Sequence, residues 1–212
     1  MSEALGPSAR RLGTAVRAFF AVEPAEAAKL ALAALVRELR ERPDGDAVRW
    51  VRPEGFHVTL RFLGNVPSAE LPALAQAVEA ALAGAPGFRV TLGAVRAFPS
   101  ARQPRVVVVE LEPEAELLAL AERVEVGVVA AGLEPSPRRF RAHLTLGRVR
   151  GRRLPPLELP ATGAGAGEID VHEVVLFRSD LDHDGSLYTP LACLPLAGSA
   201  PRAASFPLPT IL

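Results

Sequence analysis

Two tetrapeptides share one pattern: residues 57–60 read HVTL, and residues 143–146 read HLTL. The 212-residue chain has only four histidines, so half of them occur in this pattern. Successive side chains of a β-strand point to opposite faces. Each tetrapeptide, read as a strand, therefore presents its histidine and threonine on one face and its aliphatic residues on the other.

The flanking residues extend both strands with the same alternation. In the first strand the expected buried face holds Phe56, Val58, Leu60 and Phe62, and the opposite face holds His57, Thr59 and Arg61. In the second strand the corresponding sets are Phe140, Ala142, Leu144 and Leu146, and Arg141, His143 and Thr145. The two strands can thus place two imidazoles and two hydroxyls around one cleft.

This set of side chains suits displacement at phosphorus. Histidine titrates near neutral pH, so one imidazole can remove a proton from the attacking oxygen while the other protonates the leaving oxygen. A threonine hydroxyl can donate a hydrogen bond to a charged oxygen held between them. In-line displacement depends mainly on positioning and charge stabilisation. The pattern predicts chemistry without a metal or another cofactor.

Simpler interpretations compete with this one. A single His-x-Thr in a strand is usually structural, but two copies with matching aliphatic positions favour a functional pair. Zinc is disfavoured because neither strand carries a carboxylate or thiolate at ligand spacing. The other two histidines, His172 and His183, lie beside acidic residues and are assigned no role.

The remaining sequence predicts an α+β fold with largely antiparallel sheets. Apolar periodicity predicts three helices, at 24–40, 68–82 and 113–131. About eight strands are expected, at 15–22, 47–51, 56–64, 88–95, 105–112, the end of 135–150, 168–179 and 186–196. We expect one domain over 15–197, a loose arm over 1–14 and a Pro-rich tail over 198–212.

Composition adds limits but no function. Basic and acidic residues balance at 24 each, so no global field attracts nucleic acid. Lys29 is the only lysine, and the dominance of arginine fits either a GC-rich genome or phosphate recognition. Cys193 is the only cysteine, which excludes a disulfide framework. No apolar run approaches the ~18 residues of a membrane span, and the first residues lack the apolar core of a secretory signal, so a cytoplasmic monomer is expected.

With its flanking segments, the chain resembles the two-histidine phosphoesterases, in the branch of RNA 2′,3′-cyclic phosphodiesterases and 2′–5′ RNA ligases. The resemblance runs from Val16 to Leu196 and rests on RAFFAVEP, RWVRPEGFHVTLRFLGNV, AFPSARQPRV, FRAHLTLGRVR and VVLFRSDLDHDGSLYTPL. It implies a bilobal fold in which each lobe contributes one histidine strand to a central cleft. It also implies hydrolysis of a terminal 2′,3′-cyclic phosphate on RNA to a 2′-phosphate.

The resemblance assigns roles to individual residues. His57 would protonate the departing 3′ oxygen, His143 would accept a proton from water, and Thr59 and Thr145 would hold phosphate oxygens. Arg148 matches a family arginine five places after the second histidine. Strict alternation would point Arg148 to the apolar face, so either Gly147 allows a β-bulge or the strand ends before it.

Three positions depart from the family pattern: Ala142 replaces a common proline, Arg96 replaces a common glycine, and the RVVVVE strand lacks an aromatic. These departures concern substrate positioning and loop shape rather than the proposed acid and base. Phe20 and Phe140 are candidates for stacking on a nucleobase, with core packing as the alternative for each. The arginines between 138 and 153 could form a phosphate-binding rim or a solvated loop.

The sequence therefore predicts a metal-independent cyclic phosphodiesterase that acts on RNA ends or small cyclic nucleotides, without a membrane partner. A ligase running the reverse chemistry is one alternative, because the same acid and base would serve both directions. A binder of RNA or nucleotide ends without turnover is another, although binding alone needs no acid–base pair.

Overall fold

The computed structural model describes residues 14–100, 102–150, 167–182 and 185–198. His183 and almost all of the predicted arm and tail lie outside these residues. The described chain contains helices α1 (Glu26–Arg40), α2 (Leu71–Leu82) and α3 (Glu114–Ala130). Its strands are β1 (Ala15–Val22), β2 (Val48–Trp50), β3 (Val58–Pro67), β4 (Phe88–Phe98), β5 (Val106–Glu112), β6 (His143–Val149), β7 (Glu168–Val171), β8 (Glu173–Asp182) and β9 (Gly185–Pro195).

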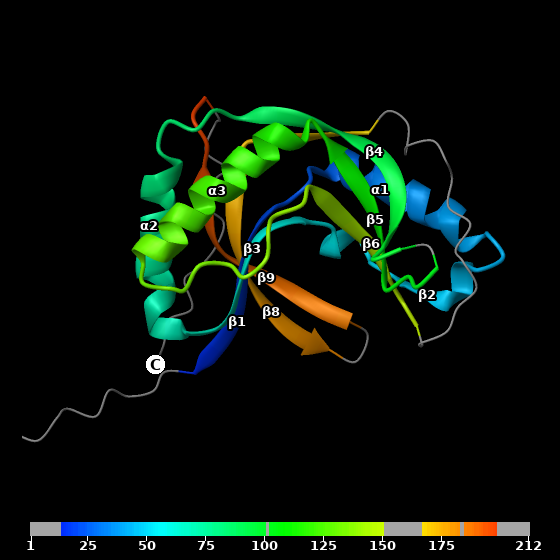
Figure 1. Cartoon of the computed structure of the whole chain (residues 1–212), viewed down its shortest axis with the longest axis horizontal. Helices are drawn as coiled ribbons and strands as arrows, with labels where there is room; N and C mark the ends of the chain where they lie inside the picture. Colours follow the sequence, from blue (N-terminus) through cyan, green and yellow to red (C-terminus); the bar gives the residue numbers. More distant parts are fainter. Residues whose placement is uncertain (1–13, 101, 151–166, 183–184, 199–212) are drawn as a thin grey trace, which may run out of the picture.

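The strands form two sheets, and every pairing between neighbouring strands is antiparallel. Sheet A has the order β3-β1-β8-β9, and sheet B has the order β2-β6-β5-β4-β7. Helices α2 and α3 pack together and contact β3 and β9 of sheet A, whereas α1 lies beside sheet B (Figure 1). The predicted α+β fold with two antiparallel sheets flanked by helices is confirmed.

The helices form where the apolar stripes predict them. The buried residues of α1 are Ala28, Leu32, Leu35, Val36 and Leu39, which is the face expected from the sequence. Buried leucines and valines of α2 and α3 join these residues and the inner faces of both sheets in one main core. A second, small cluster, made of Phe19, Ala21, Val175 and Phe177, lies on the other face of sheet A. Each residue of β1 from Ala18 to Val22 thus packs in one of the two clusters, in alternation.

The segment 168–179 is not the single strand that the sequence predicts. It contains β7, which pairs with β4 in sheet B, and β8, which pairs with β1 in sheet A; only His172 separates them. β7 alternates charged and apolar residues and β8 has an apolar run directly after its first residue, and both patterns are typical of a strand, so a local pattern cannot reveal that the chain changes sheets. Strand β4 also runs on to Phe98 where a loop was expected, because Ala97 and Phe98 pair with Val107 and Val106.

Two register shifts between β1 and β3 overturn part of the expected alternation. Arg61 is opposite Phe20 rather than on the face of His57, and its Nε lies 2.6 Å from a carboxylate oxygen of Glu125 in α3. Phe62 is 52% exposed rather than buried, and its ring lies 5.6 Å from that of Phe19. Because β3 contains extra residues, Arg61 lies on the face of sheet A that was expected for Phe62, and Phe62 lies on the face that was expected for Arg61.

Gly127 sets the close approach of α3 to α2. A Cβ at this position would lie 2.5 Å from Val78 Cα and 2.9 Å from the Ala77 carbonyl oxygen. An unobstructed Gly→Ala change in a helix stabilises by about 1 kcal/mol, but here backbone blocks the methyl group. We expect Gly127→Ala to lower the free energy of unfolding by about 1–3 kcal/mol, the usual cost of overpacking, as measured by urea denaturation.

The matched control is Val126→Ala, at a neighbouring position of α3 that is 63% exposed. It should change the free energy of unfolding by no more than about 0.5 kcal/mol. A more stable Gly127→Ala variant would contradict the tight α2–α3 contact.

Candidate active site

His57 lies at the junction between a single 3₁₀ turn, Pro53–Gly55, and strand β3. Its ring packs against Phe19 and edge-on against Tyr188, with centroid separations of 4.9 Å and 4.8 Å. Its Nδ1 lies 2.8 Å from the carbonyl oxygen of Gly55. Because a carbonyl can only accept a hydrogen bond, Nδ1 carries the hydrogen and Nε2 is left for proton transfer.

His143, the first residue of β6, is held in the same way. Its Nδ1 lies 2.8 Å from the carbonyl oxygen of Arg141, again two residues earlier in the chain. The Phe98 ring lies 6.2 Å from its ring. The two histidines therefore share one tautomer and one orientation relative to their strands, and each leaves Nε2 available for another partner.

The fold brings both histidines to the sheet faces that the helices leave uncovered. The ring contact with Phe19 places His57 on the side of sheet A that carries the second cluster. His143 alternates with Leu144, which belongs to the main core, so it faces away from that core. Strands β3 and β6 contact each other, and the charge of His143 acts on His57. Imidazoles 86 positions apart in the sequence thus share one electrostatic environment; an open cleft between them stays a prediction.

Thr59 and Thr145 follow the histidines onto the same faces. Thr59 is opposite Ala21 of the second cluster, and Thr145 is opposite Val108, which lies outside the main core. Both side chains are partly exposed. Neither hydroxyl hydrogen-bonds another residue in the described part of the chain, so both can donate to a bound anion.

Arg148 reaches the histidine face through a β-bulge. Val108 of β5 is opposite Thr145 while Val107 is opposite Gly147, so β6 contains one extra residue at this point. Of the two alternatives left by the sequence, the bulge is the correct one, because β6 continues to Val149. A Cβ at Gly147 would lie 2.4 Å from Val48 Cγ1, which explains the glycine. The exposed Arg148 then shares a face with Thr145.

The surroundings of His57 lower its pKa from 6.5 to about 4. Burial is the largest cause, because desolvation disfavours the imidazolium ion. The positive charges of Arg148 and His143 lower the pKa further, whereas the hydrogen bond to Gly55 and the carboxylate of Glu23 oppose the shift. In the ligand-free protein His57 is therefore neutral at pH 7. An anion bound between His57 and Arg148 would offset the nearby positive charges and favour its protonation.

The structure places Phe20 and Phe140, the two candidates for stacking on a nucleobase, in different surroundings. Phe20 has 0% exposure and belongs to the main core, so the prediction that it stacks on a base is wrong. Alternation along β1 directs Phe20 to the core and Phe19 to His57. Phe140 is partly buried against the main core, and its stacking stays a prediction.

Other aromatic residues near the histidines were not found from the sequence. Tyr188 borders His57, Phe62 borders Phe19, and Phe98 borders His143 and lies under the guanidinium of Arg141 at 5.1 Å. These aromatic residues belong to β9, β3 and β4. They lie near the histidines only because of the way the strands pair and because of the β-bulges in them. The segments around Phe98 and Tyr188 are among those on which the family resemblance rests. No pattern within either segment, however, predicts that it lies close to a histidine.

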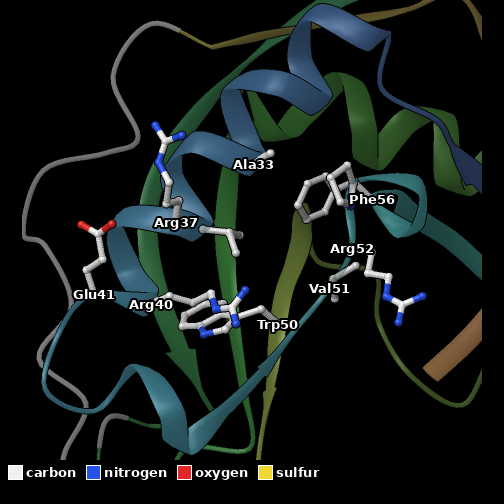
Figure 2. A pocket seen from close by; sticks show the side chains of 10 residues that line it. Ala33, Arg37, Arg40, Glu41, Trp50, Val51, Arg52 and Phe56 are labelled. Atoms are coloured by element: carbon white, nitrogen blue, oxygen red, sulfur yellow. The ribbon is translucent and has the colours of Figure 1, made fainter. Parts of the chain in front are cut away.

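The structure has a cavity of about 410 Å³ on the α1 side of β2, away from this site. Figure 2 shows Trp50 and Phe56 lining it beside Ala33 and Arg37 of α1. The Trp50 indole donates a hydrogen bond to the carbonyl of Gly45, which anchors β2 against the turn after α1. The cavity therefore lies on one face of sheet B, and His143 and Thr145 lie on the opposite face.

Two further properties concern the described residues only. They contain no group of three or more His, Cys, Asp or Glu side chains arranged to hold a metal ion. Among them no helix combines the length and apolarity needed to cross a membrane.

Comparison with known proteins identifies the family. The model of the LigT-like phosphoesterases matches the chain twice, over residues 22–108 and 109–188, with one of the two histidine strands in each match. The chain belongs to the LigT-like phosphoesterases. Each matched segment also contains a long helix before its histidine, α1 in the first and α3 in the second.

Relatives of this LigT-like phosphoesterase carry consistent names. The chain is 32% identical over 179 residues to the RNA 2′,3′-cyclic phosphodiesterase of Methanothermobacter thermautotrophicus, covering 82% of this chain and 95% of that protein. A crystal structure from Thermus thermophilus matches with 30% identity and a TM-score of 0.71, over 87% of this chain and 100% of that one. The crystal structure of E. coli LigT complexed with 3′-AMP matches with 26% identity and a TM-score of 0.72, over 86% and 99%.

We expect NMR titration of the imidazole resonances to give His57 a pKa near 4 in the ligand-free protein. Between pH 6.5 and about 4 the unfolded chain binds a proton that folded His57 does not, so this residue's contribution to the free energy of unfolding falls as the pH is lowered. Inorganic phosphate should raise the pKa of His57. A pKa near 6.5, unmoved by phosphate, would contradict the burial and the shared electrostatic environment.

Proposed function

We propose that this LigT-like phosphoesterase hydrolyses 2′,3′-cyclic phosphate ends of RNA to 2′-phosphomonoesters by general acid–base catalysis. The observation that carries the proposal is the matched orientation of two histidines. Each donates from Nδ1 to a backbone carbonyl two residues earlier, so each keeps Nε2 for proton transfer. The relatives named RNA 2′,3′-cyclic phosphodiesterase support the choice of substrate.

In the proposed reaction His143 removes a proton from a water molecule. The water oxygen forms a new bond to phosphorus while the bond from phosphorus to the 3′ oxygen breaks. His57 gives its proton to the departing 3′ oxygen, and the 2′ ester bond remains. After the reaction His143 is protonated and His57 is neutral, so one proton must be exchanged with solvent before the next turnover.

Thr59, Thr145 and Arg148 would bind the non-bridging phosphate oxygens. Both hydroxyls are without a hydrogen-bond partner in the described chain, and Arg148 offers a cationic donor on the same face as Thr145. The charge that develops on these oxygens in the transition state is stabilised by donors already in place. The binding of an anion also favours the protonated form that His57 needs as acid.

Hydrolysis is favoured over the two alternatives. Binding without turnover would not require two histidines with the same tautomer and a free Nε2. Ligation would need the 5′-hydroxyl of a second RNA in the place of water, whereas the relatives are named as phosphodiesterases. A cytoplasmic location and a monomeric state stay predictions.

The proposal is tested by product analysis. The purified protein is incubated, with EDTA present, with a short RNA that ends in a 2′,3′-cyclic phosphate, and the 2′- and 3′-phosphate products are resolved. We expect a 2′-phosphate product and no effect of EDTA. A 3′-phosphate would reverse the assignment of the leaving oxygen, and binding of the RNA without any product would support a binding protein instead.

Substitution of either histidine should abolish most of the turnover. We expect His57→Ala and His143→Ala each to lower kcat by at least ~10²-fold, the usual scale of lost general acid–base catalysis. His172→Ala is the matched control, because His172 lies between β7 and β8 with a side chain that is 41% exposed. Near-wild-type kcat in either of the first two variants would remove that histidine from the mechanism.

A further inference from the structure

Arg49 lies directly opposite Arg148 across strands β2 and β6. Its neighbours Val48 and Trp50 are opposite Val149 and Gly147; Val48 is buried, and Trp50 lines the cavity on the α1 side (Figure 2). Alternation along β2 therefore directs Arg49 to the other face of sheet B. That is the face of Arg148 and Thr145.

The two guanidinium groups lack a compensating charge. Both side chains are exposed, and neither forms an ion pair or hydrogen bond with a described residue. Several other arginines of the two sheets do form ion pairs: Arg61 with Glu125 at 2.6 Å, Arg96 with Glu110 at 3.3 Å, and Arg178 with Asp180 at 2.8 Å. Like charges directly opposite each other destabilise a sheet. Two neighbouring phosphates of one RNA chain, one on each guanidinium, would relieve that repulsion and give each arginine a charge-assisted contact.

The position of the pair relates it to the reaction. Arg148 is close enough to His57 for its charge to act on that imidazole. In sheet B, Arg49 of β2 lies on the side of Arg148 that faces away from β5. Strand β2 is the last strand of the sheet, so no further strand covers this edge within the described part of the chain. A polynucleotide whose end reaches the histidines could leave the site over this edge, with its backbone phosphates next to Arg49.

We infer that Arg49 binds the phosphodiester that links the terminal nucleotide to the rest of the RNA, so that RNA chains are better substrates than cyclic mononucleotides. The inference rests on the proposed function and adds a substrate class to it. A mononucleoside 2′,3′-cyclic phosphate has the reacting phosphate but lacks this second one. Arg49 would therefore increase specificity for a chain without taking part in the chemical step.

The test compares two substrates: a short RNA that ends in a 2′,3′-cyclic phosphate, and adenosine 2′,3′-cyclic monophosphate. We expect Arg49→Gln to lower kcat/KM for the RNA by about tenfold, the scale of one charge-assisted contact. kcat/KM for the mononucleotide should stay within about twofold of the wild type. Arg49→Lys, which keeps the charge, should restore part of the loss.

A binding measurement gives a readout that is independent of turnover. The affinity for an RNA ending in a 2′-phosphate is followed by fluorescence anisotropy at several salt concentrations. Loss of one phosphate contact should reduce the slope of log affinity against log salt by about 0.7 for a single strand. Arg37→Gln is the charge-matched control, since Arg37 lies in α1 on the other side of sheet B. It should leave the slope and both kcat/KM values unchanged.

Three outcomes would overturn the inference: no loss on RNA in Arg49→Gln, an equal loss on both substrates, or the same loss in Arg37→Gln. An equal loss on both substrates would mean that Arg49 binds the terminal phosphate. The same loss in Arg37→Gln would mean that only the net charge of the protein matters. If the wild-type protein hydrolyses neither substrate, the proposed function fails. The salt slope of Arg49→Gln still decides whether Arg49 binds the chain.

Discussion

The hydrogen bond from each imidazole to a backbone carbonyl two residues earlier is the constraint on which the site depends. A carbonyl can accept but not donate, so this contact determines which ring nitrogen carries the hydrogen. It also ties each ring to the backbone at the start of its strand, at Gly55 for His57 and at Arg141 for His143. Two strands of different sheets thereby present equivalent nitrogens, and the threonine two residues further along each strand lies on the same face.

Unequal surroundings then distinguish the two histidines. The ring of His57 is packed between Phe19 and Tyr188, and burial is the main reason for its low pKa. The cationic residues nearby act in the same direction, so the ligand-free site favours a neutral imidazole there. An anionic substrate would oppose that balance, because its charge would favour the imidazolium ion that the proposed acid requires. In the proposed mechanism, the protonation of His57 as the acid is in this way coupled to the presence of the substrate.

β-Bulges decide which other side chains join the histidines. One extra residue in β6 turns Arg148 toward Thr145, and extra residues in β3 place Phe62 beside Phe19 and send Arg61 to α3. The edge position of β2 leaves Arg49 next to Arg148 without a neighbouring strand on its outer side in the described chain. The polar groups that surround the reaction site therefore depend on irregular pairing more than on strand periodicity.

The sequence by itself determined most of the helices and strands and predicted the class of reaction, whereas only the tertiary structure decided which elements meet. Helical periodicity predicted the buried face of α1, and the repeated His-x-Thr predicted the acid, base and phosphate donors, because alternation and helical spacing arise within one element. The tertiary structure divided 168–179 between two sheets and buried Phe20. It also brought Tyr188 and Phe98 to the histidines and placed a bulge at Gly147. Each of these results depends on a partner strand far away in the sequence, whose register and bulges no local pattern contains.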